Sequence, residues 1–470
     1  MSSSSRFLFR PIFHRSSNYL VSKSPTPFKS LIPLSRRYMS TAAAAAFPCL
    51  ISKSPTPFKS LSPLSHRQLS TTAAASDAAA SPCLMLPPSF KCGVINHNFY
   101  SLEQNKVITL AGSREKELAE VLVKPFHHRA LKGSSHGYLA LFDEDSLDLF
   151  LYNPISKRYI KLPLIRDLPN TSKKNYFTVT KVILSCSPDE DYENCRAIMM
   201  YNCSLLAFCL PWRSDKWTSF GRFPDGYKEI VYSSENHLLF GLTNKDKCLE
   251  SWDLRDFSSP TMVMSTDLYS DNNGSESKDE EKLMTKRLES EDWYALPEED
   301  RPCYFRFPED RLVVANYQLL LVTRYMMGNV APDGSYVDCH KEEAKNCPHF
   351  TIDFDVHKYN PEKGNFTHLD WLVDLALFVG GLESDTFALP VSSCSGLKAN
   401  SVYFTDSTGT SYWKTMNGIC CDYAAPFGGH DIGIFDYENK TISSCYYPCD
   451  VESVEMILPS PMWFFPSSPI

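Results

Sequence analysis

The chain has 470 residues, 43% hydrophobic and 22% charged, a composition typical of a globular protein with a large buried core. Its net charge of −8 is unevenly distributed, because residues 1–76 contain ten Lys or Arg and no Asp or Glu. The remaining chain is strongly acidic, which argues against binding to a nucleic-acid backbone. No apolar run reaches the length of a membrane span, so we expect a soluble mature protein.

Residues 1–76 have the Ser-, Arg- and Ala-rich composition of an organellar transit peptide. They contain a near-duplicate, since residues 22–31 return as 52–61, and each copy leads to an arginine-flanked serine, Ser40 or Ser70. We expect mitochondrial import with removal near one of these serines. Plastid delivery and a merely disordered basic tail are the alternatives.

From residue 84 to 260 the sequence predicts short strands separated by turns, with no sustained helical periodicity. A first meander combines apolar runs at 134–142, 149–152 and 158–163. The strands predicted after it are 177–184, 196–201, 205–210, 227–232, 237–242 and 249–254.

A repeated unit organises this pattern. Residues 152–154 and 359–361 both read Tyr-Asn-Pro, and each proline is followed by an aromatic residue five positions later and a leucine eight positions later. Residues 433–442 form a looser third copy. We interpret the unit as strand, polar turn and strand, repeated in successive blades of a propeller. Chance is the alternative, because Asn-Pro turns are common in antiparallel proteins.

Residues 270–300 are polar and acidic and are predicted to be a disordered loop insertion. Strands resume at 311–324 and 349–359, and a hairpin is expected at 431–443.

The fold class predicted from these elements is all-β. We expect a β-propeller over residues 84–466, with about seven blades, six to eight being possible, preceded by a disordered transit peptide. The strands at the two ends of this domain should pair within one blade and close the ring.

Four motifs in order resemble the plant KIB-type β-propeller domain family, an F-box-associated domain of unknown function. They are the Ser-x-Gly-x-Leu and Asn-Pro-x-Ser…Leu-Pro pair at 135–163, and the stretches 371–381, 402–406 and 463–466. The resemblance implies a propeller. A transit-like leader stands where an F-box would precede it, so the chain is similar to the organellar, F-box-less branch, and no role as a ubiquitin-ligase scaffold is expected.

Residues 133–137 match the G-x-S-x-G pattern of a serine nucleophile, Ser135. That pattern requires a strand before the serine and a helix after it, whereas a meander follows here. We therefore expect a structural turn in which Ser135 lies at the surface and tolerates alanine, while Gly137 needs its backbone freedom.

A zinc site could be drawn from Cys339, His340, Cys347 and His349, but the C-x-x-C spacing is missing. Trp252-Asp253 resembles the WD dipeptide without its Gly-His partner or a second copy. Phosphate-loop and dinucleotide motifs are absent. The sequence thus predicts no catalytic, cofactor-binding or metal site, and the sixteen cysteines are expected to be reduced thiols.

The function predicted from the sequence is a non-enzymatic protein-interaction module inside an organelle, with an unknown protein partner. The alternative is an enzyme whose active site lies in the propeller channel and is assembled from scattered loops.

Overall fold

The computed structural model describes residues 80–91, 94–111, 131–143, 146–168, 178–202, 204–221, 226–244, 248–256, 259–268, 308–328, 330–331, 337, 347–381, 384–406, 428–449, 454–457 and 459–468. All of these residues belong to one compact unit, which includes Ala78–Ile470. The expected leader and the acidic stretch 270–300 lie outside the described residues.

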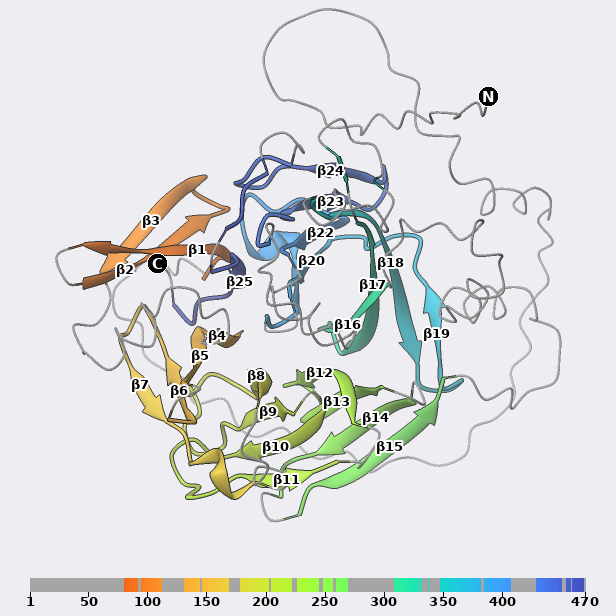
Figure 1. The fold of residues 1–470 in the computed structure, drawn as a ribbon. Coiled ribbons are helices and arrows are strands. Elements are labelled where there is room, and N and C mark those ends of the chain that lie inside the picture. The colour runs from red at the N-terminus through yellow and green to blue at the C-terminus, as the bar shows by residue number, and fades with distance from the viewer. Residues whose placement is uncertain are drawn as a thin grey trace, which may run out of the picture. The chain divides into compact units, whose positions relative to one another are not determined.

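The described strands form six sheets, which we call blades 1 to 6 in chain order (Figure 1). Blade 1 contains β1 (Cys83–Lys91), β2 (Val94–Ser101), β3 (Lys106–Ala111) and β25 (Met462–Phe464). Blade 2 contains β4 (Leu131–Ser135), β5 (Tyr138–Asp143), β6 (Asp148–Tyr152) and β7 (Tyr159–Lys161). Blade 3 contains β8 (Val179–Leu184), β9 (Ala197–Tyr201), β10 (Leu205–Cys209) and β11 (Thr218–Phe220).

Blade 4 contains β12 (Tyr227–Ser233), β13 (Leu238–Thr243), β14 (Cys248–Asp253) and β15 (Thr261–Asp267). Blade 5 contains β16 (Glu309–Ala315), β17 (Gln318–Met327), β18 (Phe350–Asn360) and β19 (Asn365–His368). Blade 6 contains β20 (Leu375–Val379), β21 (Phe387–Pro390), β22 (Ser401–Phe404), β23 (Gly433–Asp436) and β24 (Thr441–Ser443). The helical elements of the described chain are two 3-10 turns, Ile165–Asp167 and Val391–Ser393.

The innermost strands of the blades follow one another around an axis. β25 contacts β4, and contacts continue from β4 to β8, β12, β16 and β21. A hydrophobic core fills each space between consecutive blades, including the space between blade 6 and blade 1. The all-β propeller is therefore confirmed. The described residues form six blades, within the expected range but below the expected seven.

The first and last described strands close the ring. In blade 1, β25 lies beside β1, with Cys83 opposite Phe464 and Leu84 opposite Trp463. The side chain of Trp463 is fully buried in the core between blades 6 and 1, whereas Phe464 packs between blades 1 and 2. The expected pairing of the terminal strands is confirmed.

Strand β5 shows why blade strands read as continuous apolar runs. Leu139 and Leu141 pack toward blade 1, and Ala140 and Phe142 pack toward blade 3. Both faces of such a strand are buried, so the alternation of apolar and polar residues that marks a half-exposed strand is lost.

Two predicted strands are in fact two-residue hairpins. The run 134–142 turns at His136-Gly137, and the run 311–324 turns at Asn316-Tyr317. All four turn residues have positive φ, between 48° and 76°, as type I′ hairpins require. The sequence analysis expected a turn at 133–137 but missed the turn at Asn316-Tyr317. Neither turn has the Asn-Gly or Asp-Gly pair that usually signals a hairpin.

The repeated unit has one structure in all three copies. The side-chain oxygens of Asn153, Asn360 and Asp436 each accept the backbone N–H groups of the residues two and three positions later. The turns join β6 to β7, β18 to β19 and β23 to β24. The strand, turn and strand unit is thus confirmed as a blade repeat.

None of the described cysteines forms a disulfide bond. No helix within the described residues has the length and apolar character needed to cross a membrane.

Candidate functional site

Buried charges from three consecutive blades meet at the propeller axis. Lys181 on β8 places its Nζ 2.5 Å from Oε1 of Glu229 on β12, and both side chains are fully buried. The other carboxylate oxygen of Glu229 lies 3.5 Å from Nη1 of Arg311 on β16. Glu229 therefore bridges a lysine and an arginine, and the three residues form an ion network that links blades 3, 4 and 5.

A second polar group lies beside this network. Asp385, just before β21, accepts a hydrogen bond from the Ser135 hydroxyl and interacts electrostatically with Lys181 and His136. Burial raises the pKa of Asp385. Burial also lowers the pKa of His136, with Asp385 opposing that shift.

Ser135 is buried rather than at the surface, so the surface expectation was wrong. Its Oγ accepts the backbone N–H of Leu184 at 3.2 Å while the hydroxyl donates to Asp385. The residue ends β4 and is followed by the hairpin turn into β5. A nucleophile elbow needs a helix at that point, so the chain has the structural turn that the sequence analysis expected.

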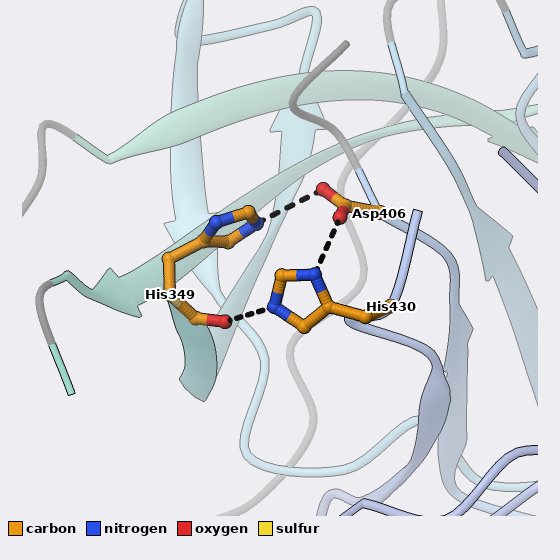
Figure 2. Close-up of side chains that lie close together, drawn as sticks. All are labelled: His349, Asp406 and His430. Carbon is orange, nitrogen blue, oxygen red and sulfur yellow. Dashed lines mark hydrogen bonds and ion pairs between the residues drawn. The ribbon is translucent and has the colours of Figure 1, made fainter. Parts of the chain in front are cut away.

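A different cluster lies where blades 5 and 6 meet (Figure 2). His349 precedes β18, Asp406 follows β22, and His430 precedes β23. Nε2 of His349 lies 3.0 Å from Oδ1 of Asp406, and Nδ1 of His430 lies 3.6 Å from Oδ2 of the same carboxylate. Nε2 of His430 donates to the backbone carbonyl of His349 at 2.8 Å. All three side chains are buried, and burial lowers the pKa of His430.

Arg324, near the end of β17, bonds to the neighbouring segments. Its guanidinium donates to the carbonyl of Thr405 at 2.7 Å and to the Asp431 carboxylate at 2.8 Å. Thr351 Oγ1 donates to the same Asp431 oxygen at 2.7 Å. These bonds connect the strand ends that carry His349, Asp406 and His430.

The grouping of histidines and cysteines drawn from the sequence lies partly outside the described residues. Cys339 and His340 lie outside the described residues, and His349 meets Asp406 and His430 instead of Cys347. The prediction missed these two partners because they are separated from His349 by more than fifty residues. The available signal was positional, since both flank predicted strands of blade 6.

Trp252 is part of a blade core. It lies on β14, is buried, and donates its indole N–H to the Tyr227 hydroxyl at 3.1 Å. The WD-like dipeptide is therefore explained by packing.

Comparisons with solved structures find weak similarity. AztD from Citrobacter koseri is 13% identical, with 58% of this chain and 51% of that one covered and a TM-score of 0.26. The Cps50 (Swd1) β-propeller domain of Myceliophteria thermophila is 11% identical over 64% of this chain and 77% of that one, with a TM-score of 0.27. Hydrazine synthase from Kuenenia stuttgartiensis is 10% identical over 59% and 62%, with a TM-score of 0.29. The present chain thus spans about half the length of the first AztD structure. At such scores no functional similarity follows.

No curated protein matches the sequence. A family match, in contrast, is extensive: residues 99–436, from within β2 to the end of β23, match the KIB1-4 β-propeller family. This span includes the meander and two of the three repeated turns entire, and it covers most of the chain. Together with the closed ring of blades, the match shows that the chain belongs to the KIB1-4 β-propeller family.

Proposed function

We propose that this protein is a non-enzymatic propeller that binds another protein inside the mitochondrion. The observation that carries the proposal is a set of exposed apolar side chains at one end of blades 5 and 6. Tyr317 is 71% exposed, Trp371 54% and Val373 75%. Val373 also has a φ of +56°, which a β-branched residue rarely adopts, and such strain concentrates at functional positions.

Strand pairing places Tyr317 at a defined end of blade 5. The hairpin of β16 and β17 opens at Glu309 and Arg324 and turns at Asn316-Tyr317. Because Arg324 contacts Thr405 beyond the end of β22, the open end of the hairpin lies with that end of blade 6. Tyr317 therefore lies at the opposite end.

Trp371 and Val373 lie at the same end as Tyr317. Both lie within the four residues before β20. Because β20 runs parallel to β22, the start of β20 lies away from the end of β22. Trp and Tyr are the residues most enriched among those that dominate protein interfaces, and propellers bind partners through loops held on rigid blades. This end of blades 5 and 6 is the proposed partner-binding face.

Site-specific photo-crosslinking tests the face. A photoreactive amino acid is placed at position 371, or at Trp212 as a matched control, an exposed tryptophan between β10 and β11 of blade 3. In isolated mitochondria we expect one discrete adduct from position 371, lost when Val373→Asp is added, and none from position 212. Equal adducts from the two positions, or none from either, would contradict this assignment.

The enzyme alternative is tested separately. Ser135 uses its hydroxyl as donor to Asp385 and as acceptor from Leu184, which leaves it poorly placed to attack a substrate. A fluorophosphonate probe should leave the purified protein unlabelled. Labelling that disappears in Ser135→Ala would refute the non-enzymatic proposal.

The organelle assignment is supported by the acid-free composition of residues 1–76. A fluorescent fusion of residues 1–80 should enter mitochondria. A fusion that stayed in the cytosol would overturn the assignment, and delivery to plastids would replace it with the alternative.

A further inference from the structure

Three potential metal ligands converge between blades 5 and 6. His349, Asp406 and His430 each offer one donor atom, and these atoms lie within 4.8 Å of one another. Their side chains are 5%, 0% and 3% exposed. Figure 2 shows the two imidazole rings on one side of the Asp406 carboxylate. The donors come from three segments, so the cluster exists only when the two blades pack together.

The hydrogen bond to the His349 carbonyl fixes the tautomer of His430. A carbonyl oxygen only accepts, so the proton of the neutral ring is on Nε2, which lies 2.8 Å from it. The Nδ1 lone pair then points toward Oδ2 of Asp406 at 3.6 Å. Two electron-rich atoms facing each other in a buried site repel, and a cation between them converts the repulsion into binding.

The same hydrogen bond is a feature of metal-binding histidines. A ligating imidazole almost always donates its second ring N–H to a carboxylate or a backbone carbonyl, which orients the ring and strengthens its donor nitrogen. His430 makes this bond to the backbone of His349, itself a member of the cluster. The backbone of His349 thus holds the imidazole ring of His430 in place.

The neighbouring aspartate shows the contrast. Asp431 is compensated by the Arg324 guanidinium at 2.8 Å and bonded by Thr351. Asp406, equally buried, faces one ring nitrogen from each of two imidazoles. Buried carboxylates are stable when paired with a cation or bound to a metal. Asp431 has the first kind of environment and Asp406 has the ligand set of the second.

We propose that His349, Asp406 and His430 bind a zinc ion that fastens blade 5 to blade 6. Imidazole nitrogen and carboxylate oxygen are standard zinc ligands, and tetrahedral zinc separates its donors by about 3.3 Å. His349 Nε2 lies 3.0 Å from Oδ1 of Asp406 and His430 Nδ1 lies 3.6 Å from Oδ2, so each separation is close to that value. The fourth position is left for a further ligand. The site goes beyond protein binding, and the sequence analysis expected no metal there.

Metal analysis of the full chain, purified without a histidine tag, tests the proposal. After dialysis the wild type should retain about one zinc per chain. Asp406→Asn, which keeps the size and one acceptor oxygen, and His430→Ala should each lose it. His368→Ala is the matched control, because this histidine also lies beside aspartates but its side chain is 42% exposed. That variant should retain zinc as the wild type does.

A second measurement does not depend on whether the variants fold. Wild-type protein stripped with a chelator should gain several degrees in its unfolding midpoint when zinc is restored, because a ligand that binds only the folded state stabilises it. Cobalt added to the stripped protein should give the visible absorption bands of a tetrahedral site, and zinc should abolish them. Wild type with no bound zinc and no zinc-dependent midpoint would overturn the proposal. Zinc retained in both Asp406→Asn and His430→Ala would overturn it as well.

Discussion

Gly137→Ala tests how the C-terminal segment locks the ring. Gly137 lies in the β4–β5 turn with a φ of +76°. A Cβ added there would lie 2.6 Å from the backbone nitrogen of Ser467 and 2.7 Å from its Oγ, closer than real Cβ contacts. Ser467 follows β25 and also accepts a hydrogen bond from the Asn153 side chain at 3.2 Å. The methyl group would therefore push on the segment that completes blade 1.

The expected destabilisation has two parts. A residue other than glycine in the left-handed region costs about 1–2 kcal/mol. Overpacking against a backbone atom adds roughly 1–3 kcal/mol. Gly364→Ala separates these parts, because Gly364 has a similar φ of +67° but its Cβ would meet only the Thr266 methyl group, at 3.1 Å. We expect a loss of about 2–5 kcal/mol for Gly137→Ala and about 1–2 kcal/mol for the control.

Urea denaturation followed by tryptophan fluorescence measures both variants. The midpoint of Gly137→Ala should fall well below that of Gly364→Ala, with an unchanged slope if the unfolded state is unaffected. Equal midpoints for the two variants would refute the reasoning, because they would mean that the contact between Gly137 and Ser467 adds nothing to the cost of the turn.

Three further predictions concern the axis, the thiols and the closing strand. Glu229→Gln removes the anion between two buried cations and should lower the free energy of unfolding by about 3–5 kcal/mol. Lys228→Met, the control at a half-exposed ion pair, should change it by under about 1 kcal/mol. Urea titrations measure both variants. The pKa of Cys186 is lowered to about 7, chiefly by a hydrogen bond from a neighbouring thiol, whereas burial raises the pKa of Cys83 to about 12. Alkylation of Cys186 should therefore rise with pH through about 7, while Cys83 stays unreactive. Equal labelling of the two cysteines at pH 8, measured by mass spectrometry, would contradict this prediction. Trp463→Ala leaves a cavity between blades 6 and 1 and should cost about 3–5 kcal/mol, seen as a lower thermal midpoint; an unchanged midpoint would show that β25 is not needed for closure.

Much of the fold could be predicted because its signals are local. The turns at Asn153 and Asn360 form because each asparagine side chain bonds to backbone N–H groups only two or three residues later in the chain. The apolar strands on either side are equally local signals. The number of blades was harder to predict, because the estimate of seven came from dividing the length of the domain by a typical blade length. That estimate counted residues 112–130 and 407–427 as parts of blades, and these ranges add no described strand. The hairpin turn at Asn316-Tyr317 lacks the usual Asn-Gly or Asp-Gly pair, so the sequence analysis predicted one strand across it.

The clusters could not be predicted from spacing. His349 and Asp406 belong to different blades, and only the way blade 5 packs on blade 6 sets them 3.0 Å apart. The network of Lys181, Glu229 and Arg311 likewise depends on the order of innermost strands around the axis. The sequence analysis recognised Ser135 as a turn residue but misjudged its burial, because surrounding blades cover a turn that looks exposed in a single hairpin.

The pairing of β25 with β1 also dictates an order of assembly. Among the six described blades, blades 2 to 6 are each built from one continuous stretch and can form as the nascent chain lengthens. Blade 1 must wait for Met462–Phe464, which is synthesised after all the other described strands. A product truncated before Met462 would keep five whole blades and still fail to close, leaving core faces exposed at the seam, where cellular proteases act on incomplete folds. Closure of the ring therefore depends on a strand that is synthesised after blades 2 to 6.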